Sequence, residues 1–117
     1  MIERLQPGPR LSQVVIHGDT VYVAGQVARD PTSDVAGQTR QILESIDHLL
    51  AEAGTDKSRI LSATIYLANI GTFADMNLVW DTWVSPGNTP ARATVEARLA
   101  APAYKVEIQV IAARPGP

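Results

Sequence analysis

Residues 12–27, SQVVIHGDTVYVAGQV, decide the start of the fold, because two runs rich in β-branched residues flank the pair Gly18-Asp19. Such a pair is typical of a two-residue hairpin turn whose first residue has a positive φ. The turn predicts that four apolar residues pair on one face, Ile16 with Val21 and Val14 with Val23. The opposite face keeps Val15 and Tyr22, so both faces of the hairpin are partly apolar.

The segments that follow alternate between helical and strand periodicity. Apolar residues at helical spacing predict helices over 35–53 and 72–84, and alternation predicts strands over 60–67, 91–99 and 104–112. Ser33 or Asp34 can cap the first helix, and Gly54 follows its end. Thr72 and Asp75 resemble a capping box for the second helix.

The element order is therefore β-β-α-β-α-β-β, which is typical of an α+β fold. The Ala-Ala-Pro-Ala segment at 100–103 is short enough to join the last two strands as a hairpin. Two helices can cover one face of the sheet, and no further element is available for the other face. We therefore expect copies of the chain to associate through that second face, which would bury Val15, Tyr22 and Ile111.

Length and composition are those of one small globular domain. The 117 residues, 45% of them hydrophobic, predict a single domain over 1–117 whose ordered part spans about 8–113. The net charge is −2, and the sequence has no basic stripe of the kind that nucleic-acid binders carry. We therefore expect no nucleic-acid partner. No apolar run approaches a membrane span and no signal peptide is visible, so we expect a cytoplasmic protein without a membrane partner.

The common catalytic motifs are absent from the sequence. There is no cysteine, no phosphate-binding glycine loop and no metal-ligand spacing, so the sequence predicts neither a metal site nor a cofactor. His17 and His48 are expected at the surface. Asn77 falls on the apolar stripe of the second helix, where its side chain needs a hydrogen-bonding partner.

Two interpretations fit the charged residues of the last two strands. Arg92 follows Thr89-Pro90-Ala91 at a strand entrance, where its guanidinium could grip a small carboxylate, while Glu107 on the next strand could orient or deprotonate a water molecule. Alternatively, Arg92, Glu96, Arg98 and Glu107 form a cross-strand ladder of ion pairs that faces solvent. Spacing alone favours the ladder.

Three motifs resemble the YjgF/RidA family of reactive-intermediate deaminases. They are TPARATVEARL at 89–99 followed by KVEIQVIAA at 105–113, VAGQ at 23–26, and FADMN at 73–77. The resemblance runs from about Gly8 to Ala113. The segments 57–67 and 80–84 are especially similar to the short YoaB-like branch of the family.

The resemblance implies a chorismate mutase-like fold and a homotrimer, in which the sheets form a central barrel with clefts between subunits. It implies hydrolysis of 2-imino or enamine acids to 2-oxo acids and ammonia, without a cofactor. Arg92 matches the carboxylate-binding arginine and Glu107 the glutamate that positions water. Gly25, Asn77 and Thr94 match positions that line the cleft.

The sequence departs from the family pattern at three positions. Arg10 stands where the archetype has an aromatic residue, Ala24 precedes Gly25 in place of serine or threonine, and Thr94 replaces cysteine. An arginine at position 10 beside Arg92 would strengthen anion binding, so a second hypothesis is a module that binds a 2-oxo or amino acid without turnover. RNA cleavage, a third activity attached to some members, is disfavoured by the acidic composition.

Overall fold

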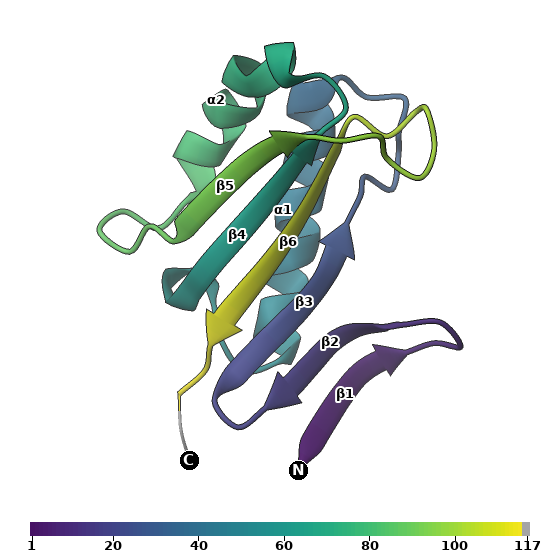
Figure 1. The fold of residues 1–117 in the computed structure, drawn as a ribbon. Helices are drawn as coiled ribbons and strands as arrows, with labels where there is room; N and C mark the ends of the chain where they lie inside the picture. The colour runs from purple at the N-terminus through teal and green to yellow at the C-terminus, as the bar shows by residue number, and fades with distance from the viewer. Residues whose placement is uncertain (116–117) are drawn as a thin grey trace.

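The computed structural model describes residues 1–115, and residues 116–117 lie outside the described residues. Six strands form one sheet in the order β1-β2-β3-β6-β4-β5, and both helices pack against the same face of it (Figure 1). The strands are β1 (Ile2–Pro7), β2 (Ser12–His17), β3 (Thr20–Gln26), β4 (Ile60–Leu67), β5 (Ala91–Glu96) and β6 (Val106–Ala113). The α-helices are α1 (Val35–Glu52) and α2 (Phe73–Trp83), and two short 3-10 helices span Lys57–Arg59 and Ile70–Thr72.

The first predicted hairpin is confirmed as β2 and β3. Val14 pairs with Val23 and Ile16 with Val21, and all four side chains are buried. Gly18 has a φ of 62°, which a residue with a Cβ rarely adopts, so glycine suits this turn position. The hairpin places one apolar row in the core.

Strand β1 was not predicted, and its presence corrects the expected order to β-β-β-α-β-α-β-β. It lies before residue 8, where the sequence indicated that the ordered part begins. Its side chains are exposed except for the half-buried Leu5, so no buried row marks it in the sequence. Antiparallel pairing with β2 holds it at the sheet edge.

The predicted hairpin between the last two strands is wrong. Strand β6 pairs antiparallel with β3 and with β4, while β5 pairs only with β4 and runs parallel to it. The physical reason is the intervening helix: α2 must cover the sheet between β4 and β5, and a strand–helix–strand unit returns the chain in the same direction. Residues 97–105 therefore form a connection that crosses the end of β4.

The helix ends follow the sequence in part. The Asp34 side chain accepts a hydrogen bond from Gly37 N and caps α1, and Gly54 has a φ of 82° just after the helix. The capping box predicted for α2 is wrong. Thr72 makes no side-chain cap, because its hydroxyl donates to Asn69 O at 2.7 Å.

The core lies between the helices and one face of the sheet, and the other face is open. Buried apolar side chains come from α1, α2 and alternate positions of all strands except β1 and β5. On the open face Tyr22 is 45%, Val95 43% and Leu61 53% exposed. Among residues 1–115, no helix is both long and apolar enough to cross a bilayer.

A buried glutamine joins α1 to the connection between β5 and β6. Gln38 is 0% exposed, and the two hydrogens of its amide nitrogen are shared among three carbonyl oxygens, those of Pro31, Ser33 and Ala103, at 3.0 to 3.1 Å. Its amide oxygen accepts a hydrogen bond from Lys105 N at 2.9 Å. One carboxamide therefore fastens the loop before α1 to the loop that leads into β6.

We expect Gln38→Leu to lower the free energy of unfolding by about 3 kcal/mol, because leucine has a similar size but leaves buried polar groups without partners. Urea denaturation measures the change. The exposed Gln109 offers a control, since Gln109→Leu should alter stability by no more than about 0.5 kcal/mol. A loss below about 1 kcal/mol for Gln38→Leu would contradict this role.

Candidate functional site

Arg92 lies on the helix-covered face of the sheet, where α2 holds its side chain. The parallel register places Arg92 beside Ala63, whose side chain belongs to the core, so the two share a face. Arg92 Nη1 donates to Asn77 Oδ1 at 2.8 Å, which confirms that Asn77 has a polar partner. The guanidinium carbon lies 5.2 Å from the ring centroid of Trp80 and 5.7 Å from that of Phe73.

All three contacts that orient the Arg92 guanidinium are with uncharged groups. Phe73, Asn77 and Trp80 recur at spacings of four and three residues, so they form one stripe along α2. The ion pairs found among residues 1–115 join Arg29 to Glu44 and Arg114 to Glu3, and His48 Nε2 lies 4.0 Å from Glu44 Oε1. None involves Arg92, although its side chain is partly buried.

A partly buried cation without a counterion is costly, and an anionic ligand would relieve that cost. The planar fork of a guanidinium matches the two oxygens of a carboxylate. Since Asn77 engages one nitrogen, other donors of the group are left for a ligand. The geometry therefore suits Arg92 to bind a small carboxylate.

Glu107 lies on the open face, next to Gly25. It pairs with Tyr66 of β4, while its neighbours Val106 and Ile108 point into the core. A Cβ built on Gly25 would overlap the Glu107 carboxylate, with the carboxyl carbon only 3.0 Å away. Glycine at position 25 thus leaves the space that the carboxylate occupies.

The Glu107 carboxylate lines a groove of about 350 Å³ on this open face. The polar or charged side chains that line it are Tyr66, Arg98, Glu107 and Gln109, and Gly25 and Leu99 contribute as well. A carboxylate beside an open groove can orient a water molecule or accept a proton from it.

A single chain does not bring Arg92 and Glu107 together. Strand β4 lies between β5 and β6, and the two side chains project from opposite faces of the sheet. The predicted ladder of ion pairs is therefore wrong, because it requires Arg92 and Glu107 on one face of neighbouring strands. The alternation along 91–96 is correct, but its polar row faces α2.

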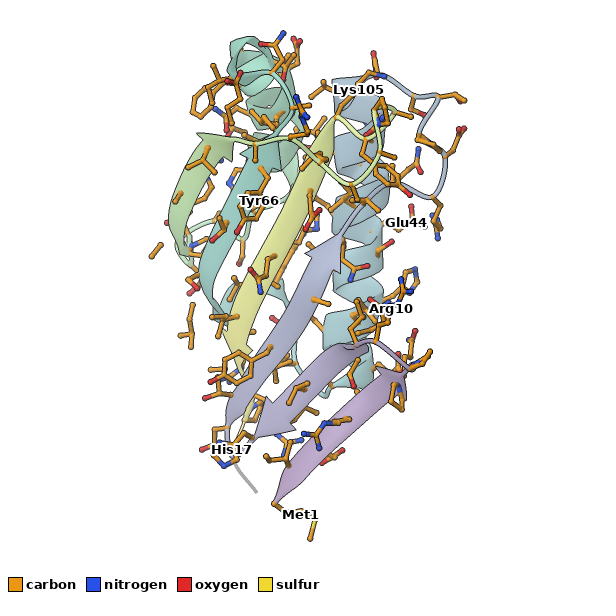
Figure 2. All side chains as sticks on the ribbon, turned by 45° about the vertical axis from the view of Figure 1, so that its right-hand side comes forward. Met1, Arg10, His17, Glu44, Tyr66 and Lys105 are labelled. Atoms are coloured by element: carbon orange, nitrogen blue, oxygen red, sulfur yellow. The ribbon has the colours of Figure 1, made fainter. Side chains whose placement is uncertain are left out.

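Of the other predicted site residues, Thr94 lies near Arg92 and Arg10 does not. Thr94 shares the helix-facing row of β5, and its hydroxyl oxygen is buried with no hydrogen-bond partner among residues 1–115. Arg10 lies in the turn between β1 and β2, at the opposite end of the strand order from β5 (Figure 2). The predicted pairing of Arg10 with Arg92 does not form within one chain.

Sequence reasoning missed the aromatic contacts of Arg92 and the residues that share the groove with Glu107. Trp80 belongs to the buried apolar stripe of α2, and the sequence signal for its contact with Arg92 is its spacing of three residues from Asn77. Arg98, Tyr66 and Gln109 were not expected near Glu107. Their association depends on β4 and β6 being neighbours, which the sequence pattern does not reveal.

Two carboxyl groups outside this region have a lowered pKa. Hydrogen bonds from the hydroxyl and backbone N–H of Thr32 lower the pKa of Asp30, and those of Ser58 lower the pKa of Asp56. Both aspartates are exposed and organise turns. Across residues 1–115, no three His, Asp or Glu side chains gather as a metal site would require.

Known proteins resemble this chain over almost its whole length. A family described as endoribonuclease L-PSP matches residues 1–114. A RutC family protein of Haemophilus ducreyi is 51% identical over 113 residues, which cover 97% of each chain. The RutC family protein YoaB of Escherichia coli is 46% identical over 112 residues, covering 96% of this chain and 97% of that one.

A more distant relative has an activity in its name. The 2-iminobutanoate/2-iminopropanoate deaminase of Rattus norvegicus is 34% identical over 107 residues, covering 86% of this chain and 77% of that protein. The crystal structure of NMB1025 from Neisseria meningitidis, a member of the YjgF family, superposes with a TM-score of 0.96 at 43% identity. The superposition covers 100% of this chain and 98% of the Neisseria chain. These matches confirm the resemblance seen in the sequence, and the chain belongs to the YjgF/RutC family, which the endoribonuclease L-PSP description covers.

Proposed function

We propose that this protein hydrolyses 2-imino acids to 2-oxo acids and ammonia. Arg92 binds the substrate carboxylate, and Glu107 orients a water molecule onto C2 of the protonated imine. The water oxygen bonds to C2 as the C=N π pair moves to nitrogen, and Glu107 accepts a water proton and passes it to that nitrogen. The C–N bond then breaks, the remaining hydroxyl proton is lost as the carbonyl forms, and the nitrogen leaves as ammonia. Because a protonated imine is already electrophilic, the site has to supply mainly position and proton transfer.

The observation that carries the proposal is the Arg92 guanidinium, which neutral groups orient and no carboxylate within residues 1–115 neutralises. A carboxylate of an incoming acid would supply the missing counterion. The named activity of the rat relative supports the same substrate class. Thr94, with its unpartnered hydroxyl two residues from Arg92, would contact the bound acid.

In this proposal the complete site lies between two copies of the chain. Arg92 of one copy and Glu107 with Gly25 of another face the same cleft, since one chain holds these groups on opposite faces of its sheet. A homotrimer whose open sheet faces form a central barrel would bury exposed side chains such as Tyr22 and Leu61. Arg10 would then reach the cleft from a neighbouring copy.

Replacing Arg92 tests the carboxylate assignment. We expect Arg92→Lys to lower turnover at least about tenfold and Arg92→Ala to remove nearly all of it, because a bidentate charged contact is worth about 1.5–3 kcal/mol. Glu107→Gln should keep ligand binding but lower turnover, since an amide cannot accept the proton from water. The assay measures ammonia and 2-oxo acid released from enzymatically generated 2-iminopropanoate.

Exposed residues outside the site provide matched controls, with Arg59→Ala and Glu44→Gln expected to retain full activity. Unchanged imine hydrolysis by the Arg92→Ala protein would end the catalytic assignment. If the unaltered protein binds a 2-oxo acid without accelerating hydrolysis over buffer, the binding-module hypothesis is favoured instead.

The space at Gly25 supplies an independent test. Gly25→Ala places a methyl group where the Glu107 carboxylate lies, so we expect the carboxylate to move and turnover to fall about tenfold or more. Gly87→Ala, in a loop that does not line the groove, strains a backbone whose φ is 78° and so controls for destabilisation without a change at the Glu107 carboxylate. Circular dichroism should report folded protein in both cases, and full activity of Gly25→Ala would contradict the role of this space.

Complementation tests whether the site lies between copies. We expect sedimentation at micromolar concentration to show a species of three 12.6 kDa chains. Chains carrying Arg92→Ala and chains carrying Glu107→Gln, each with lowered turnover alone, should show higher activity when refolded together than either shows by itself. In a random mixture about one quarter of the sites would take intact Arg92 from one chain and intact Glu107 from the other. A monomer, or no regain of activity, would refute the shared site.

A further inference from the structure

Arg98 lines the same groove as Glu107, and the proposed mechanism gives Arg98 no role. It lies just beyond β5, in the connection between β5 and β6. Ala97 N donates to Leu67 O at 2.9 Å and fixes the start of this connection. The hydrogen bonds of Gln38 to Ala103 O and Lys105 N fix its far end. The backbone that carries Arg98 is thus held at both ends.

The guanidinium of Arg98 and the carboxylate of Glu107 line one groove without forming an ion pair. Among residues 1–115, neither side chain has a hydrogen-bond or ion-pair partner. The groove of about 350 Å³ leaves room for a small acid beside the two groups. The apolar side chains of Ala97, Leu99 and Ala100 complete this end of it.

We propose that Arg98 is a specificity-determining residue, which selects 2-imino acids whose side chain ends in a second carboxylate. This inference rests on the proposed function, because it takes a 2-imino or 2-oxo acid as the ligand of the groove. Arg92 of a neighbouring copy binds the carboxylate at C1, and Glu107 orients the water at C2. The side chain of the substrate then extends along the groove, and its terminal carboxylate binds the guanidinium of Arg98.

The polar groups that line the groove favour a dianionic ligand over one with an apolar side chain. An apolar substrate side chain would contact Leu99 but would leave the Arg98 guanidinium and the Gln109 amide unused. A second carboxylate would accept hydrogen bonds from the guanidinium and place a negative charge beside a positive one. A second carboxylate on the ligand would be repelled by the Glu107 carboxylate, and the Arg98 guanidinium in the same groove would offset that repulsion.

Binding measurements separate this role from catalysis. Calorimetry would compare 2-oxobutanoate, with one carboxylate, and 2-oxoglutarate, with two, as stable product-like probes. We expect the unaltered protein to bind 2-oxoglutarate about tenfold more tightly. Arg98→Gln should remove that preference and leave the affinity for 2-oxobutanoate within about twofold, while Arg98→Lys retains part of it. Arg59→Gln, at an exposed position of the first 3-10 helix, should change neither affinity.

Three results would overturn the proposal. If the unaltered protein binds 2-oxoglutarate no more tightly than 2-oxobutanoate, the proposed specificity does not exist. If the Arg98→Gln protein still prefers 2-oxoglutarate, another residue must bind the second carboxylate. Equal weakening of both probes by Arg98→Gln would make Arg98 the anchor of the C1 carboxylate in place of Arg92. The measurement needs no turnover. A protein that fails to hydrolyse imines but loses its dicarboxylate preference with Arg98 would refute the deaminase proposal alone.

Discussion

Strand β6 hydrogen-bonds to β3 on one side and to β4 on the other, and this central place arranges both halves of the candidate site. On the β3 side, the pairing register shifts between Val23 and Gln26, the segment in which Gly25 lies beside Glu107. On the β4 side, the next neighbour is β5, so Arg92 belongs to the sheet edge that α2 covers. The separation of the acidic and basic groups follows from strand order together with the opposite faces from which the two side chains project.

The surroundings of Arg92 show how a protein can orient a cation without neutralising it. A carboxylate partner would hold the guanidinium firmly, but it would compete with any acid that arrived as a ligand. An amide oxygen and two aromatic rings also fix the direction of the guanidinium. Because they carry no net charge, they compete much less with an anionic ligand. Trp80 also contacts Trp83, whose indole nitrogen donates to Asp47 Oδ2 on α1 at 3.0 Å. The aromatic contacts of Arg92 thereby connect to the packing of the two helices.

Local patterns in the sequence predicted local structure well. The β-branched runs around Gly18 and the apolar spacing of α1 correspond to elements whose stabilising partners are near in the chain. Asn77 was correctly expected to need a hydrogen-bonding partner, because a polar side chain on the buried stripe of a helix needs one in any fold. The family resemblance pointed to Arg92, Glu107 and Gly25 before their surroundings were known.

Pairing between distant segments was harder to predict. Alternation along β5 separates two rows of side chains but does not say which row faces the helices, and an edge strand with an alanine row allows either choice. That ambiguity produced the incorrect ladder, whereas the incorrect hairpin came from the short segment at 100–103, which also allows a connection across β4. Strand β1 lacks a buried row, so only its hydrogen bonds to β2 define it. The groove neighbours of Glu107 depend on the same long-range pairing.

The carboxamide of Gln38 has a consequence for the motions of the connection that carries Arg98. A nine-residue segment without helix or strand would ordinarily exchange its amide hydrogens quickly through local opening. The amide of Lys105, however, donates to a side chain that is itself anchored in α1, 67 positions earlier in the chain. Breaking that bond disturbs a buried carboxamide that also contacts the carbonyl oxygens of Pro31, Ser33 and Ala103. The amide of Lys105 should therefore exchange about as slowly as the core amides, and the end of the connection that it fixes would keep its place when the groove is empty.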